Sequence, residues 1–127
     1  MILLDTCSLI WYTLGPEDAL SSKACKALRE TPEILVSVIS LWELGIKIQK
    51  KSIELPMTLE SYLTRLKQVD TIQIIPLDEN IVVKAFNLNW KHRDPVDRFI
   101  VATAAHFGVS VVTSDREIGA FYKKTVW

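Results

Sequence analysis

The sequence contains few of the residues that mark several classes of binding protein. Only four glycines are present and no glycine-rich loop, so a nucleotide cofactor is not expected. The two cysteines, Cys7 and Cys25, lack the spacing of metal ligands, and we expect both to be buried small apolar side chains. Excess charge is missing too, because 15 basic residues balance 15 acidic ones. A nucleic-acid partner would therefore need a local basic patch.

Long apolar runs are also absent. None approaches the roughly 18 residues of a membrane-spanning helix, and the N-terminus lacks the pattern of a signal peptide. We therefore expect a cytoplasmic protein without membrane contact. The 127 residues, of which 49% are hydrophobic, are enough for one domain over residues 1–127 with its own core.

Short apolar runs alternate with helical patterns along the chain. The runs predict buried strands at residues 1–5, 34–37, 72–77 and 109–113, and a short edge strand at 124–127. The helical patterns predict helices at residues 17–29, from 40 onward, at 59–69, at 78–88 and at 94–107. Residues 6–8 are expected to form a turn. This alternation predicts an α/β fold, a three-layer α/β/α sandwich with a mainly parallel central sheet.

The helix predicted over residues 94–107 has the clearest boundaries. Asp94 is a good N-cap, and Pro95 suits the first helical position, where its missing N–H is not needed. Gly108 suits the C-terminal end. Asp97 falls in the first turn, so two carboxylates are held at one helix N-terminus.

Acidic residues recur where the predicted strands end. Asp5 ends the first strand, Glu43 follows the second and Asp115 follows the fourth. Ligands of open α/β sheets bind beyond the carboxyl ends of the strands, so these acids are candidates for one site. Asp97 would join them if its helix directs its N-terminus to the same edge.

Each acid also has a structural interpretation. Glu43 could complete a capping box with Ser40 at a helix start. Asp97 and Asp115 could be a cap partner and a turn residue. Asp5 is the hardest to explain in this way, because an ionised carboxylate after four apolar residues is costly unless something pairs with it.

Clustered carboxylates repel one another unless a cation is present. No His or Cys accompanies these positions in the sequence, so oxygen ligation favours Mg²⁺ or Mn²⁺ over softer metals. Such an ion lowers the pKa of a bound water and neutralises charge on a phosphate. The chemistry that this favours is hydrolysis of a phosphodiester.

Four sequence blocks stand in order along the chain: LLDTCSLIW at 3–11, SVISLWELGIK at 37–47, HRDPVDRFIVATA at 92–104 and VVTSD at 111–115. Together they resemble the motif blocks of PIN domains and, more narrowly, of the VapC-type toxins of bacterial and archaeal toxin–antitoxin pairs. The resemblance runs nearly end to end. It implies a Mg²⁺- or Mn²⁺-dependent endoribonuclease, usually a homodimer, that is inhibited by a small antitoxin protein.

The resemblance also implies roles for individual residues. An acidic quartet would be catalytic and bind the metal: Asp5, Glu43, Asp97 and Asp115. Asp94 and Thr113 would support the site. Arg98 would contact a substrate phosphate or form an internal ion pair.

Several side chains are candidates for holding the RNA. The basic ones, besides Arg98, are Lys47, Lys50, Lys51, Lys91 and Arg93. Trp11, Trp42 and Trp90 could stack on unpaired bases, although Trp42 is expected in the core. We expect the antitoxin to dock on the apolar residues between Ile46 and Leu59.

Other functions remain open at this point. The chain could be a catalytically silent PIN-fold module that binds RNA or protein, although four intact acids argue against it. It could also be a DNA nuclease of the same fold. A phosphatase with Asp5 as nucleophile is disfavoured, because Cys7 stands where a second aspartate would be needed.

Overall fold

The computed structural model describes all 127 residues, in five strands and seven helices. The strands are β1 (Ile2–Leu4), β2 (Ile34–Ser37), β3 (Ile72–Ile75), β4 (Ser110–Val112) and β5 (Thr125–Val126). The helices are α1 (Thr6–Leu14), α2 (Ser22–Glu30), α3 (Val38–Gln49), α4 (Leu59–Lys67), α5 (Glu79–Phe86), α6 (Pro95–Phe107) and α7 (Arg116–Phe121). All five predicted strands are present.

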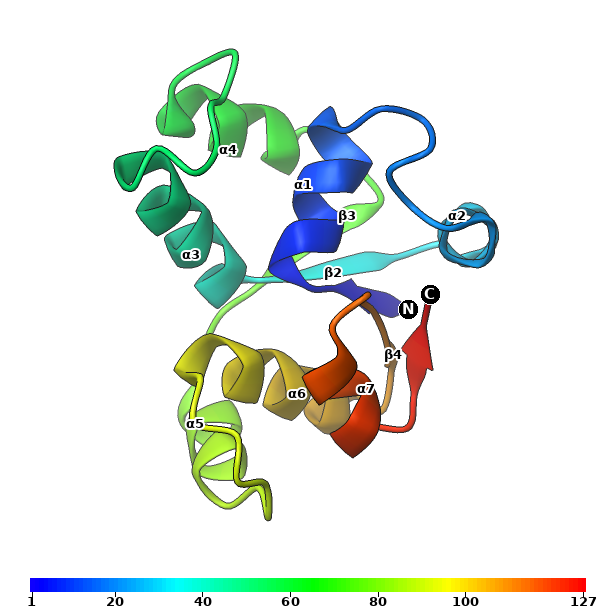
Figure 1. The fold of residues 1–127 in the computed structure, drawn as a ribbon, viewed down its shortest axis with the longest axis vertical. Helices are drawn as coiled ribbons and strands as arrows, with labels where there is room; N and C mark the ends of the chain where they lie inside the picture. The colour runs from blue at the N-terminus through cyan, green and yellow to red at the C-terminus, as the bar shows by residue number, and fades with distance from the viewer.

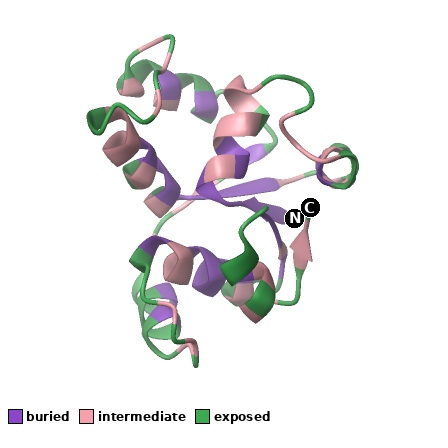
Figure 2. Cartoon of the chain, viewed as in Figure 1, coloured by how far each residue is buried: buried purple, intermediate pink, exposed green.

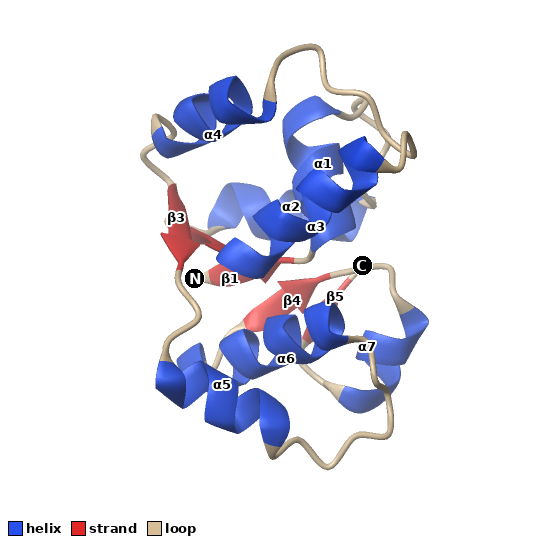
Figure 3. Ribbon diagram, turned by 90° about the vertical axis from the view of Figure 1, so that its left-hand side faces the viewer, coloured by secondary structure: helices blue, strands red, loops and turns tan.

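The strands form one parallel sheet in the order β3-β2-β1-β4-β5. The chain steps outward from β1 through β2 to β3, then returns past β1 to β4. Because parallel crossovers are right-handed, this reversal puts α1 to α4 on one face of the sheet and α5 to α7 on the other (Figures 1 and 3). The switch point, where ligands bind in such sheets, lies between β1 and β4. The predicted α/β/α sandwich is confirmed.

The core consists of two main layers, one on each side of the sheet. Successive side chains of β1 alternate between them: Leu4 packs into the cluster under α1 to α4, and Leu3 packs into the cluster with α6. Both are fully buried, as are most residues of the central strands (Figure 2). The short central strands are therefore rigid supports for the residues that follow them.

Some predicted helix boundaries are wrong. Residues 6–8 are not a turn, because α1 begins directly after β1 with Asp5 as its N-cap. Helix α2 begins at Ser22 instead of residue 17, and Ser21 caps it. Helix α3 begins at Val38, capped by Ser37, so Ser40 does not start a helix. Helix α7 was not predicted at all.

Trp42, which was expected in the core, lies outside, and so does another large side chain, Phe86. Trp42 on α3 is 58% exposed and Phe86 on α5 is 85% exposed. The apolar face that the sequence pattern predicts for these helices is wider than the face that they bury. No helix in the structure has both the length and the apolar character needed to span a bilayer.

Candidate active site

The predicted acids line one cleft of about 260 Å³ at the carboxyl edge of the sheet. Its walls include Asp5, Thr6, Cys7, Glu43, Lys47, Asp94, Asp97, Ser114 and Asp115. Helix α6 therefore does direct its N-terminus to the same edge as the strand ends. The acidic quartet that the sequence predicted is a spatial cluster.

Asp5 and Asp115 are both helix N-caps. Oδ1 of Asp5 accepts a hydrogen bond from the Ser8 N–H at 2.7 Å at the start of α1. Oδ1 of Asp115 accepts from the N–H groups of Glu117 and Ile118 at the start of α7. Each carboxylate is thus fixed through one oxygen, and its second oxygen is free of backbone hydrogen bonds. The structural and the functional interpretations of these acids are compatible.

Glu43 is not a capping-box residue. It lies in the second turn of α3, since Ser37 caps that helix by accepting from the Ile39 N–H. Lys47 follows Glu43 by one turn and is the one basic side chain that lines the cleft. A cap therefore does not explain the presence of Glu43.

Asp97 has a partner that the sequence analysis missed. Nε2 of His92 lies 2.7 Å from Oδ2 of Asp97, so one proton lies between the two atoms. Asp94 caps α6, because its Oδ1 accepts a hydrogen bond from the Val96 N–H at 2.9 Å. Each of His92, Asp94 and Asp97 offers one atom that could bind a metal, and these three atoms lie within 4.8 Å of one another. The premise that no histidine accompanies the acids is wrong.

The carboxylates of the cleft hold protons more tightly than exposed ones. Burial raises the pKa of Asp97 from 3.8 to about 6, and the charges of Asp94 and Asp115 act in the same direction. Burial also raises the pKa of Asp5 and of Glu43. The hydroxyl of Thr113, at the end of β4, opposes the shift at Asp5, as Lys47 does at Glu43. The charged forms are therefore disfavoured as long as no cation shares the cleft.

These residues fit a hard divalent cation. Carboxylates from four elements converge, one basic side chain is near them, and the acids raise one another's pKa values. A divalent ion would offset both the burial and the repulsion. Cys7 is half-buried at the cleft, not buried as expected, and burial beside Asp5 raises the pKa of its thiol. The thiol therefore stays protonated at neutral pH and adds no soft ligand.

The family model described as PIN domain matches residues 2–124. The chain belongs to the PIN-domain family. Among its relatives is Ribonuclease VapC22 of Mycobacterium tuberculosis, 33% identical over 119 residues, which are 92% of this chain and 88% of the relative. Residues 2–124, which the family model matches, include the whole quartet. The predicted resemblance to PIN domains and VapC-type proteins is confirmed.

Solved structures share the fold of this PIN domain. A toxin–antitoxin complex from Klebsiella pneumoniae has a TM-score of 0.71 at 23% identity, covering 100% of this chain and 97% of the other. VapC20 of Mycobacterium tuberculosis, described as a toxin that cleaves the sarcin–ricin loop, has a TM-score of 0.67 at 12% identity over 94% of each chain. FitAcB from Neisseria gonorrhoeae has a TM-score of 0.67 at 21% identity, covering 98% of this chain and 95% of the other.

Arg98 of this PIN domain does not form the internal ion pair that was one of its two expected roles. Its guanidinium donates to the backbone carbonyls of Ala85 at 2.8 Å, Leu88 at 3.1 Å, Trp90 at 2.7 Å and His92 at 3.0 Å, with a longer contact to Phe86. None of these acceptors is a carboxylate, so the ion-pair interpretation is wrong. Because its donors are used within the protein, Arg98 is reassigned from substrate contact to support of the preceding loop.

Trp90 is also occupied within the PIN domain. Its ring stacks on Phe121 of α7, with centroids 4.7 Å apart and planes 9° apart, and packs against His92 at 4.7 Å. The expected stacking on an RNA base is therefore not favoured. Lys91 and Arg93 lie exposed on either side of His92 and line a second hollow with Trp90 and Arg98.

Proposed function

We propose that this PIN domain is a divalent-metal-dependent endoribonuclease and the toxin of a toxin–antitoxin pair. The observation that carries the proposal is the convergence of Asp5, Glu43, Asp97 and Asp115 on one cleft. The identity of 33% to a protein named as a ribonuclease supports RNA as the substrate. A cytoplasmic location, where RNA and an inhibitor would meet the protein, is part of the same proposal.

The quartet would hold Mg²⁺ or Mn²⁺. When bound, such an ion supplies a Lewis acid that makes water more acidic and neutralises charge on a phosphate. The protein contributes preorganised ligands: the caps of α1 and α7 fix Asp5 and Asp115, and His92 fixes Asp97. Asp94 and Thr113 support the site from the start of α6 and the end of β4.

The substrate backbone would approach from the basic side of the cleft. Lys47 lines the cleft itself and can pair with a phosphate oxygen. The hollow lined by Lys91, His92 and Arg93 adjoins the cleft, because His92 contacts Asp97 directly. We propose Lys47 and Arg93 as phosphate contacts, and we no longer propose Arg98.

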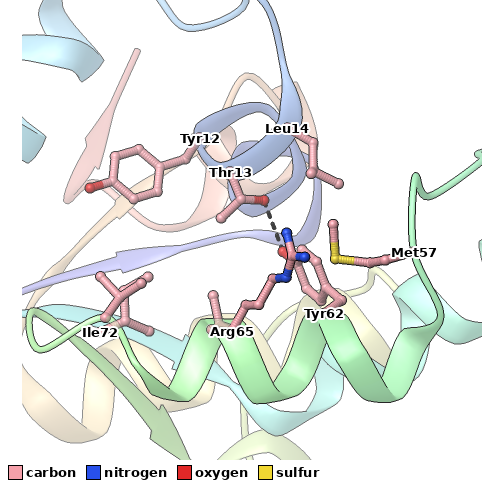
Figure 4. Close-up of a pocket in the computed structure, with 9 residues that line it drawn as sticks. Tyr12, Thr13, Leu14, Met57, Tyr62, Arg65 and Ile72 are labelled. Carbon is pink, nitrogen blue, oxygen red and sulfur yellow. Dashed lines mark hydrogen bonds between the residues drawn. The ribbon is translucent and has the colours of Figure 1, made fainter.

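An inhibitor would bind away from these charges. The apolar residues expected to form its docking surface are half-buried against the core, as Ile48 and Leu59 illustrate. A pocket of about 470 Å³ lies beside them, between α1 and α4 (Figure 4). Tyr12, Met57 and Val69 line it, and the Tyr62 hydroxyl lies 2.9 Å from Oγ1 of Thr13. We propose that an apolar side chain of a cognate antitoxin fills this pocket.

Cleavage assays test the proposed function. Labelled single-stranded RNA and DNA of the same sequence are incubated with the protein in Mg²⁺, in Mn²⁺ and in EDTA, and with the Asp5→Asn variant. Cleavage of RNA that needs the metal and is lost in the variant supports the proposal. Equal cleavage of DNA would favour the DNA nuclease, and inertness on diverse RNAs without metal binding would favour a silent module. The homodimer that the family resemblance implies is tested separately by light scattering.

A further inference from the structure

The loop between α5 and α6 is fixed although it contains no helix or strand. Residues 87–94 lack regular structure, so most of their carbonyls have no partner within a helix or sheet. Arg98 donates to the carbonyls of Trp90 and His92, shares that of Leu88 with the Trp90 N–H, and also bonds the last carbonyls of α5. One planar guanidinium thus holds the end of one helix and the loop that follows it.

The same loop is held on its other side by α7. Trp90 lies flat on Phe121 of α7, and His92 packs against Trp90. The second ring nitrogen of His92, Nδ1, lies 4.0 Å from Oε2 of Glu117, also on α7. The position and orientation of the imidazole are therefore set by the Trp90 ring and the hydrogen bond to Asp97, and the exposed Glu117 carboxylate lies nearby.

The position of His92 limits what Asp97 can do. The contact of 2.7 Å occupies Oδ2 of Asp97, and no other hydrogen bond to the Asp97 carboxylate is present. Rotation of this carboxylate about its terminal bond would break the contact. Asp97 is also only 17% exposed, so little water is available to replace His92. Oδ1 is left as the oxygen that can face a cation.

We propose that His92 is a positioning residue, which holds the Asp97 carboxylate so that Oδ1 is presented to the cation of the cleft. The inference rests on the proposed function in one respect, namely that Asp97 is a metal ligand. In metal sites, hydrogen bonds of this kind orient the side chains that bind the ion directly. Loss of such a hydrogen bond lowers metal affinity by about 10- to 100-fold. Arg98, Trp90 and Phe121 act through His92, because they fix the loop that carries it.

Two substitutions separate the hydrogen bond of His92 from its ring. His92→Phe keeps a ring against Trp90 but has no donor. His92→Gln keeps an N–H donor near the position of Nε2 but lacks the ring. His106→Phe is the matched control, since His106 is the one other histidine and lies exposed at the far end of α6. Mn²⁺ affinity is measured by calorimetry for all three and for the wild type, and thermal melting is recorded for each.

If His92 positions Asp97, the three variants should differ in their affinity for Mn²⁺. His92→Phe lowers Mn²⁺ affinity about 10- to 100-fold, and His92→Gln and His106→Phe stay within about threefold of the wild type. RNA cleavage by His92→Phe recovers at saturating Mn²⁺, because the defect is one of metal binding. If His92→Phe bound Mn²⁺ weakly only because the fold is less stable, His92→Gln, which also lacks the ring, would not restore the affinity.

Three other outcomes overturn the inference. If His92→Phe binds Mn²⁺ as the wild type does, the hydrogen bond does not position Asp97. If His92→Gln is as weak as His92→Phe, the imidazole itself is a ligand, as its proximity to Asp94 and Asp97 allows. If the wild type itself binds no divalent ion, the proposed metal-dependent function is wrong and the inference is wrong with it. The calorimetry of the wild type alone reveals this case, before the variants are compared.

Discussion

Asp5 and Asp115 lie just beyond the carboxyl ends of two neighbouring strands, β1 and β4. Leu4 of β1 pairs with Val112 of β4, so the two chains leave the sheet side by side. Each aspartate then caps the helix that follows its strand through Oδ1. Two parallel strands and two caps thus bring two carboxylates to the switch point of the sheet, where ligands of this architecture bind.

This arrangement predicts that Asp5→Asn separates activity from stability. Asparagine still caps α1, and it removes a buried carboxylate whose pKa is raised by burial. We expect RNA cleavage to fall at least about 100-fold, because each 1.4 kcal/mol of lost transition-state stabilisation is tenfold and a metal supplies several. The melting temperature should stay the same or rise. Cleavage assays and thermal melting of the purified variant measure both.

Asp78→Asn is the matched control for this variant. Asp78 caps α5 with the same geometry, accepting from the Ile81 N–H at 2.9 Å, but it does not line the cleft. Its replacement should leave cleavage unchanged. Equal loss of activity in the two variants would show that the effect of Asp5→Asn comes from the cap and not from the cleft.

The acids could be predicted from the sequence because parallel strands end at one edge. An apolar run that stops at Asp5, and another followed by Asp115, were enough to predict their proximity. The cap and ligand interpretations could not be separated from sequence, and in the structure the aspartates that cap α1 and α7 also line the cleft. Helix α1 was missed because Thr6, Cys7 and Ser8 have low helix propensity. Burial of Leu9 and the N-cap that Asp5 provides outweigh that preference.

The stability of the metal-free protein should depend on pH through Asp97. Its pKa is about 6 in the folded state and 3.8 in the reference state, so the folded state binds more protons between these values. Stability therefore falls as pH rises from about 4 to about 6, by roughly 1–3 kcal/mol. The pKa of His92 is raised above 6.5, mainly by its hydrogen bond to Asp97, so its contribution is lost at still higher pH.

Thermal melting in EDTA across this pH range measures the effect. Asp97→Asn should flatten the profile between pH 4 and 6, whereas Asp70→Asn, at an exposed position, should not. Added Mg²⁺ should restore stability near neutral pH in the wild type, because a ligand that binds the folded state stabilises it. A profile of the wild type that rises from pH 4 to 6 would contradict the assignment.

Arg98→Ala should destabilise the fold more than it affects substrate binding. The substitution removes the donor to the partly buried carbonyls of Ala85, Trp90 and His92, which we expect to cost about 2–4 kcal/mol in urea unfolding. Arg98→Lys should rescue only part of this loss, since an ammonium cannot reproduce the planar fork. Arg116→Ala, on the exposed start of α7, is the control. Unchanged stability with weakened RNA binding would return Arg98 to the substrate role.

Val69→Asp should reduce inhibition by the antitoxin without loss of RNA cleavage. Val69 is 40% exposed and lines the pocket between α1 and α4, so a charge there opposes an apolar occupant. We expect affinity for the inhibitor to fall by roughly 10-fold or more. Val83→Asp on α5, where Val83 is 58% exposed, is the control on another surface. Identical inhibition of the two variants would place the docking surface elsewhere.

The contacts of His92 and Arg98 lay beyond the reach of the sequence for different reasons. His92 stands five residues before Asp97, and its position just ahead of a capped helix could have suggested proximity. Arg98 bonds backbone carbonyls, which every residue carries, so no pattern of side chains marks its partners. The exposure of Trp42 was equally hidden, because helical periodicity does not reveal how wide a face is covered.

A crystal structure of the wild type with Mn²⁺, examined for anomalous scattering, tests the metal site most directly. We expect an anomalous peak inside the cleft, coordinated by Asp5 and Oδ1 of Asp97 together with Asp115 or Glu43. His92 should remain hydrogen-bonded to Oδ2. A cleft without a peak, at a Mn²⁺ concentration that saturates RNA cleavage, would contradict the assignment of the quartet as the metal site.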